Sequence, residues 1–353
     1  MEEEVYRRLA QKLDALPNRF PPTSSGVELK ILCRLFAPEE AALACELRLE
    51  PESAASVAAR LGADPQQTRA SLKRMLAKGL IDIKKGEGEF AYALKPFVVG
   101  FYEGQLPRLD VEMATMFEDY FRETKGAILR EAPALHRIIP VDKAIPLEVE
   151  IHPLQSATEI LNNAQAWGVR ECICRKQQRL LGHDCGHPLE SCLVFAHTPH
   201  AFDRSSVDRA ITKDEALRIL RQTEDAGLVH SSGNYRDGID YICNCCICCC
   251  GIIRGIAEYG IMSAVARSDF QITVDADSCT ACGDCIERCQ FHALALSGAT
   301  LSVDVARCVG CGLCVVVCPT EGLHLERRKA GEVQPTPVTI EAWRAQRSST
   351  QNG

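Results

Sequence analysis

The chain has 353 residues, a formal net charge of -7 and 20 cysteines, and this length is enough for two or three domains that each bury a core. The acidic balance gives no general reason for nucleic-acid or anionic-lipid binding, and no apolar run reaches the roughly 18 residues that span a bilayer. The first residues lack the basic and apolar regions of a signal peptide, so we expect a cytoplasmic protein with reduced thiols rather than a disulfide framework.

The N-terminal part of the chain has the pattern of a small helical domain followed by a hairpin. We expect an N-terminal helix within residues 1–25 and, after it, a domain over residues 26–95. In that domain Pro38 begins the second of four helices, and Asp64 caps the fourth. Two strands then flank Gly86-Glu87-Gly88, which is typical of a hairpin turn.

This order of helices and hairpin resembles the winged-helix domain, which is common in bacterial transcription regulators. The resemblance implies either DNA binding or protein docking. Basic residues on the fourth helix and the hairpin could meet phosphates, and they are Arg69, Lys73, Arg74, Lys78, Lys84 and Lys85. Because a charge run on a helix is usually a solvated face, DNA binding is the less favoured of the two interpretations.

We expect residues 96–150 to be a helical connector and residues 151–258 to be a Cys-rich helical middle module. In this module Ser156-x-x-Glu159 predicts a helix that ends at Gly168, and Thr212-x-x-Glu215 predicts a second helix. Ten cysteines are too many to be inert core residues, and soft thiolates select iron-sulfur clusters or zinc in a reducing compartment. The ten are Cys172, Cys174, Cys185, Cys192, Cys243, Cys245, Cys246, Cys248, Cys249 and Cys250.

These ten thiols cannot all bind one metal, because neighbouring side chains in an extended segment face opposite sides. Four of them, or a few more for a larger cluster, are enough for one centre. An iron-sulfur cluster, a zinc site and a redox-active dithiol all remain open. Arg175 follows Cys174 and could offset the negative charge of a thiolate-bound cluster, and His183 or His187 could complete a mixed site.

The C-terminal part contains the spacing Cys-x2-Cys-x2-Cys-x3-Cys twice. Each run can wrap three thiolates around one face of an iron-sulfur cube, and its fourth Cys ligates the other cluster. We therefore assign Cys279, Cys282, Cys285 and Cys318 to one [4Fe-4S] cluster, and Cys308, Cys311, Cys314 and Cys289 to its partner. Gln290 follows Cys289 where the bacterial pattern has Pro, so we expect an altered turn or an altered reduction potential and not a missing cluster.

The doubled spacing resembles the dicluster ferredoxin family, whose members carry electrons between redox enzymes. For residues 259–328 the resemblance implies a ferredoxin-like βαββαβ domain. The cysteine order of the longer chain is also similar to that of ferredoxin-type proteins of anaerobic bacteria, which implies a role in anaerobic metabolism. The expected fold class is therefore α+β and predominantly helical, and the polar residues 329–353 are expected to form a flexible tail.

The sequence contains neither a dinucleotide-binding fingerprint nor a Walker-type phosphate loop, so bound NAD, flavin or ATP is unsupported. We expect an iron-sulfur electron-transfer protein with two [4Fe-4S] clusters and a third centre, iron-sulfur or zinc, in the middle module. Its partners would be redox proteins, which it would serve as a free carrier or as the electron-transfer subunit of an oxidoreductase. The alternative is an iron-sulfur redox sensor that binds DNA through the winged-helix domain.

Overall fold

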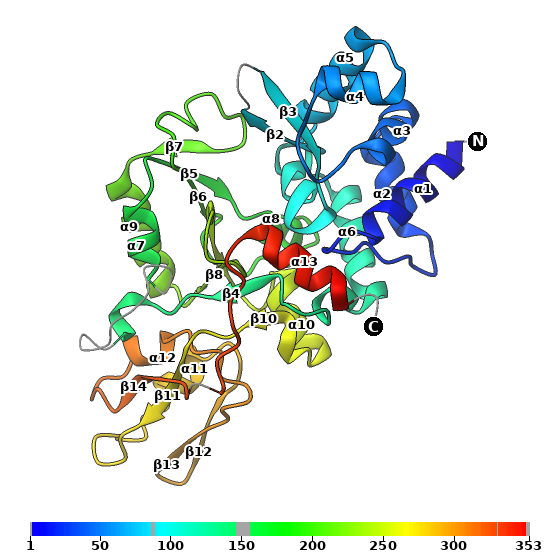
Figure 1. Cartoon of the computed structure of the whole chain (residues 1–353). Helices are drawn as coiled ribbons and strands as arrows, with labels where there is room; N and C mark the ends of the chain where they lie inside the picture. Colours follow the sequence, from blue (N-terminus) through cyan, green and yellow to red (C-terminus); the bar gives the residue numbers. More distant parts are fainter. Residues whose placement is uncertain (1, 86–88, 146–155, 330, 351–353) are drawn as a thin grey trace. The chain divides into compact units, whose positions relative to one another are not determined.

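The computed structural model describes residues 2–85, 89–145, 156–329 and 331–350 (Figure 1). The chain divides into two compact units, residues 1–128 and residues 129–353. Each unit has its own buried core and is described by itself.

The first unit is a set of helices with a small antiparallel sheet. The helices are α1 (Glu2–Asp14), α2 (Val27–Leu35), α3 (Pro38–Glu46), α4 (Ala54–Leu61), α5 (Pro65–Ala77) and α6 (Val111–Thr124), with the short turns η1 (Phe97–Phe101) and η2 (Glu103–Arg108). The strands β1 (Glu52–Ser53), β2 (Ile81–Lys85) and β3 (Phe90–Leu94) pair in the order β1-β3-β2. The expected hairpin is therefore present, while its expected turn at residues 86–88 lies outside the described residues.

Local sequence explains where α5 begins. The Asp64 side chain accepts a hydrogen bond from the backbone N–H of Gln67 at 2.8 Å, and Pro65 occupies the first helical position, where no donor is needed. Leu72 and Met75 on this helix are fully buried.

The second unit is built on a mixed sheet of seven strands in the order β10-β4-β8-β9-β6-β5-β7. The strands are β4 (His136–Ile138), β5 (Ala166–Glu171), β6 (Glu190–Ala196), β7 (Arg209–Ile211), β8 (Val229–Gly233), β9 (Tyr241–Cys245) and β10 (Val265–Ala266). The helices are α7 (Ala157–Asn162), α8 (Ile173–Leu180), α9 (Lys213–Asp225) and α10 (Gly251–Tyr259), with the turns η4 (Asp142–Ala144) and η6 (Met262–Ala264). The turn η3 (Ala127–Leu129) spans the boundary between the two units. Figure 1 shows α7 and α9 together against the strands β5 and β6.

The sheet corrects the expectation of a helical middle module and of a purely helical connector. The helix that begins at Ser156 ends at Asn162 instead of Gly168, and residues 166–171 form β5. Val169 in this strand is fully buried and pairs with both β6 and β7. Tertiary pairing therefore decides the conformation of a segment whose short apolar pattern also fits a helix.

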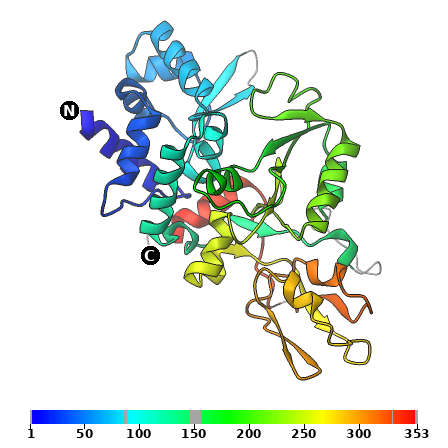
Figure 2. The same cartoon turned by 180° about the vertical axis from the view of Figure 1, so that it is seen from behind.

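The C-terminal elements follow the order strand, helix, strand, strand, helix, strand. They are β11 (Phe270–Val274), α11 (Asp284–Arg288), β12 (Leu294–Ser297), β13 (Thr300–Val303), α12 (Leu313–Val316) and β14 (Leu323–Arg327). β11 pairs with β14 and β12 pairs with β13, both antiparallel. Figures 1 and 2 show these elements gathered at one end of the second unit.

The expected flexible tail contains a packed helix, α13 (Ile340–Thr350). Trp343 and Arg347 are buried, and the indole N–H of Trp343 donates to the carbonyl of Ala134 at 2.9 Å. Arg347 donates to the carbonyls of Glu131 at 2.8 Å and Pro133 at 2.5 Å. The polar composition predicts a mobile tail because it gives no information on long-range contacts. Here two large side chains, Trp343 and Arg347, bind a segment more than 200 positions earlier in the chain.

No helix in the described ranges is long and apolar enough to cross a membrane.

Candidate metal and iron-sulfur centres

The eight C-terminal cysteines interact across the two sequence runs. Cys285 interacts electrostatically with Cys282, Cys318 and Cys279. Cys314 interacts with Cys311, Cys289 and Cys308, and also with Cys285. The structure thus brings Cys318 near the first run and Cys289 near the second, and the division into two ligand sets stays a prediction.

The second set surrounds a small apolar cavity. All four thiols line it, together with apolar side chains that include Ile272, Phe291 and Leu294. Burial raises the pKa of Cys311 to about 12 and also raises the pKa of Cys314. Metal coordination deprotonates a thiol outright, so a buried set of four thiols with apolar walls fits a thiolate-ligated cluster.

Two glycines shape the backbone around these sets. Gly283 and Gly312 stand at the N-caps of α11 and α12, with φ of 91° and 77°. Both values lie in the left-handed region that glycine adopts without steric cost. The chain can therefore turn sharply between the second and third cysteine of each run.

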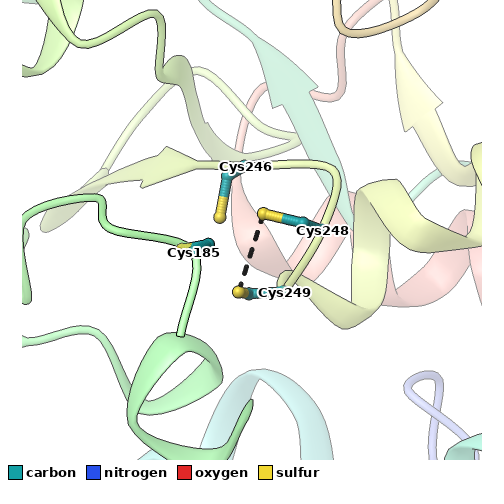
Figure 3. Close-up of side chains that lie close together, drawn as sticks. All are labelled: Cys185, Cys246, Cys248 and Cys249. Carbon is teal, nitrogen blue, oxygen red and sulfur yellow. Dashed lines mark hydrogen bonds between the residues drawn. The ribbon is translucent and has the colours of Figure 1, made fainter. Parts of the chain in front are cut away.

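Four cysteines of the middle module form a compact site (Figure 3). Their Sγ atoms all lie within 4.8 Å of one another, and the Sγ atoms of Cys248 and Cys249 are 3.7 Å apart. Cys246, Cys248 and Cys249 come from the turn after β9, and Cys185 comes from the loop after α8. We call Cys185, Cys246, Cys248 and Cys249 the four-thiol site.

The four-thiol site has the dimensions of a site for one ion. Four thiolates in a tetrahedron around one ion, with bonds of about 2.3 Å, are about 3.8 Å from one another. The four thiolates of a cubane cluster must stand farther apart, because each binds a different iron. The 3.7 Å between Cys248 and Cys249 matches the single-ion geometry.

A buried arginine lies beside this site. Arg175 is 2% exposed, its Nη1 lies 3.6 Å from Sγ of Cys246, and the same nitrogen donates to the carbonyl of Asn244 at 3.0 Å. Interactions with the thiols of Cys248 and Cys249, and then with Arg175, hold the pKa of Cys246 well below its usual range. The site therefore favours at least one thiolate, which is the form that binds metal.

The other six cysteines of the middle module are not members of this compact group, although Cys174 packs against the cluster of Leu228, Cys246 and Cys249. They are Cys172, Cys174, Cys192, Cys243, Cys245 and Cys250. Within the described ranges, neither His183 nor His187 joins a compact group of metal-ligating atoms. His187 instead lines a cavity of about 550 Å³ that also touches Cys246 and Cys248.

Gln290 connects the C-terminal elements to the cysteine-rich turn. Its Oε1 accepts a hydrogen bond from the backbone N–H of Ile247 at 2.7 Å, and its Nε2 donates to the carbonyl of Gly227. Ile247 lies between Cys246 and Cys248, and Gln290 directly follows Cys289. The cysteine spacing does not predict this contact between Gln290 and the turn at Ile247. The only sequence signal for it was Gln290 itself, which stands where the bacterial pattern has Pro.

The basic residues of α5 are partly neutralised by acidic partners. Glu40 is 1% exposed, and its carboxylate lies 2.5 Å from Nζ of Lys78 and 3.7 Å from Nε of Arg74. Arg69 lies 3.8 Å from Glu89. Lys78 and Arg74 therefore balance a buried charge within the first unit, which weakens the argument that they serve DNA phosphates.

The comparison with protein families bears on the C-terminal elements. The family model of the 4Fe-4S binding domain matches residues 272–295 and 301–323. These residues form a pair of adjacent 4Fe-4S binding motifs. Each motif of this 4Fe-4S domain contains one complete run of four cysteines, which confirms the expected iron-sulfur character of the C-terminal part. No curated protein and no solved structure matches the chain.

Proposed function

We propose that this protein transfers single electrons through two [4Fe-4S] clusters in its 4Fe-4S domain, as a carrier or as a subunit of an oxidoreductase. The observation that carries the proposal is the pair of adjacent 4Fe-4S binding motifs. The interactions of Cys285 with Cys318 and of Cys314 with Cys289, each between the two runs, support an exchange of one cysteine between the ligand sets. One cluster is held by Cys279, Cys282, Cys285 and Cys318, and the other by Cys308, Cys311, Cys314 and Cys289. When bound, such clusters supply reversible one-electron chemistry, and burial and hydrogen bonds to their sulfurs tune the potentials.

The four-thiol site serves this function as a structural zinc centre. Four thiolates at the spacing of one tetrahedron are typical of closed structural zinc sites. The ion would join the turn after β9 to the loop after α8. Gln290, which bonds to that turn, would then hold the cluster ligand Cys289 against a rigid support.

The test is the metal and sulfide content of anaerobically purified protein, with electron paramagnetic resonance of the reduced sample. We expect at least the roughly eight irons of the two cubes and one zinc, with Cys248→Ser losing the zinc and keeping the cluster signals. Cys282→Ser and Cys311→Ser should each damage one cluster of the 4Fe-4S domain first. The exposed Cys33 lies in the other unit, so Cys33→Ser is the matched control and should change neither metal. Unchanged iron content and spectra in both Cys282→Ser and Cys311→Ser would refute the ligand assignment.

A further inference from the structure

The six remaining cysteines of the middle module form a closed ring of thiols. Each thiol interacts with two others, and the order around the ring is Cys172, Cys174, Cys250, Cys245, Cys243, Cys192 and back to Cys172. We call these residues the six-thiol ring. It shares no member with the four-thiol site.

The sheet explains how residues so far apart in sequence meet. β6 and β9 are neighbouring antiparallel strands with Leu193 paired to Ile242, so Cys192 and Cys243 lie one position further along the same pair of strands. Cys243 and Cys245 are two positions apart on β9 and therefore face the same side. Cys172 stands at the end of β5, which pairs with β6 on its other side.

The ring is too wide for one ion. Two thiolates on the same zinc cannot be farther apart than about 4.6 Å, which is twice a bond of about 2.3 Å. Among the described residues, the four-thiol site alone has three or more such atoms all within 4.8 Å of one another. Six ring thiols that touch their neighbours without converging on one point suit a group with several metal atoms.

Positive charge is directed at the ring from three sources. Cys172 is the N-cap of α8 and Cys250 is the N-cap of α10, so two helix N-termini begin at ring thiols. The buried Arg175 interacts with Cys172 and Cys192. Its Nε is buried and has no hydrogen-bond partner among the described residues, which leaves a donor for an additional acceptor.

We propose that the six-thiol ring holds a polynuclear iron-sulfur cluster, in addition to the two clusters of the 4Fe-4S domain. Soft thiolates select iron-sulfur groups, inorganic sulfide fills the positions between irons, and the arginine with two helix N-termini offsets the negative charge. The inference goes beyond the proposed function and does not depend on the metal of the four-thiol site.

The ring cluster would lie close to the electron path of the 4Fe-4S domain. The amide Nε2 of Gln290 lies 3.5 Å from the backbone carbonyl oxygen of Cys245, a member of the ring. Gln290 directly follows the cluster ligand Cys289 in the chain. One side chain therefore connects the backbones of two ligand sets. We expect the ring cluster to exchange electrons with the cluster that Cys289 ligates.

The experiment uses the full chain, purified without oxygen, and measures iron, sulfide and zinc per chain together with Mössbauer and electron paramagnetic resonance spectra. The wild type should contain clearly more than the roughly eight irons of two cubes. Cys192→Ser and Cys243→Ser should lose the excess iron and retain both the signals of the 4Fe-4S domain and the zinc. Cys248→Ser in the four-thiol site should lose zinc and keep the excess iron, and Cys33→Ser should change nothing.

A wild type with only about eight irons would overturn the proposal, whatever the variants do. Excess iron that survives in both ring variants would also overturn it, because the iron would then be bound elsewhere. Zinc that disappears from the ring variants in place of iron would overturn the iron-sulfur assignment. Retained signals of the 4Fe-4S domain show that each variant has folded. If those signals are missing from the wild type, the proposed electron-transfer function is refuted, and this outcome is distinct from the loss of the excess iron.

Discussion

Two glycines at the same place in the two 4Fe-4S motifs should respond very differently to alanine. Gly283 and Gly312 both have positive φ, at 91° and 77°. A Cβ on Gly283 would find only Leu296 Cδ1, at 3.9 Å, whereas a Cβ on Gly312 would lie 2.6 Å from Cβ of Ala144 and 3.0 Å from Cδ1 of Leu325. The Cβ of Ala144 is fixed to the backbone and cannot rotate away.

A comparison of Gly283→Ala with Gly312→Ala separates the cost of the left-handed backbone from the cost of overpacking. Alanine in the left-handed region costs about 1–2 kcal/mol at either position. Overpacking adds about 1–3 kcal/mol, and it adds this only at Gly312. We therefore expect Gly312→Ala to lose about 2–5 kcal/mol and Gly283→Ala about 1–2 kcal/mol. In a unit of this size the difference corresponds to roughly 2–12 °C in Tm.

The assay is thermal unfolding of anaerobic holoprotein, with the spectrum of each cluster followed separately. Gly312 lies between Cys311 and Cys314, so its variant should lose the cluster of that set first. Equal Tm values for the two variants would refute the reasoning, because they would mean that the strained φ alone determines the cost and that the contact with Ala144 is absent or easily relieved.

Three further changes have expected outcomes. Arg347→Ala removes charged hydrogen bonds to two partly buried backbone carbonyls, each worth about 1.5–3 kcal/mol. It should make α13 sensitive to limited proteolysis, whereas we expect wild-type α13 to resist. Burial lowers the pKa of His136 to about 4 from 6.5, so its neutral form contributes stability above pH 6.5 that is lost as the pH falls toward 4. The loss amounts to about 3 kcal/mol of the free energy of unfolding. In denaturant unfolding, the free energy of unfolding of His136→Gln should fall less steeply between pH 6.5 and pH 4 than that of the wild type. Equal pH slopes for the two proteins would contradict the prediction. Gln290→Ala should slow electron exchange between the 4Fe-4S domain and the middle module in flash-reduction kinetics, while Gln290→Glu, which keeps the acceptor for Ile247, should retain part of the rate.

The 4Fe-4S domain could be predicted from sequence because three of the four ligands expected for each cluster lie close together in the chain. The four cysteines of each run lie within eleven consecutive positions, counted from Cys279 to Cys289 and from Cys308 to Cys318, and the first three can surround one face of a cube. The caps of α5 and α9 were predictable for the same reason: Asp64 and Thr212 each bond to an N–H three positions later. A hydrogen bond of this kind can be predicted from sequence wherever its donor and acceptor residues are close neighbours in the chain.

The middle module was less predictable because its cysteines meet through a sheet. Cys172 and Cys243 are more than 70 positions apart, and they approach only because β5, β6 and β9 are adjacent. The first residues of β5 were expected to be the end of a helix that stops at Gly168, so the register that places Cys192 beside Cys243 could not be deduced. What the sequence did provide was the expectation that the ten thiols cannot all bind one metal. The adjacent Cys248 and Cys249 nevertheless belong to one site, because they lie in a turn and not in an extended strand.

The change from strand to turn explains how the dense cysteine run is divided. Along β9, alternate residues face the same side, which directs Cys243 and Cys245 to the six-thiol ring and Asn244 to the opposite side, where it bonds to the buried His230 at 2.5 Å. The strand ends at Cys245, and the turn that follows carries Cys246 toward the four-thiol site. Arg175 contacts Cys246 and interacts with Cys172, so one guanidinium faces both thiol sets. A change of charge at either set is therefore felt by the other. Zinc itself does not change oxidation state, so loss of the ion from the four-thiol site, as in Cys248→Ser, should shift the reduction potential of the ring cluster.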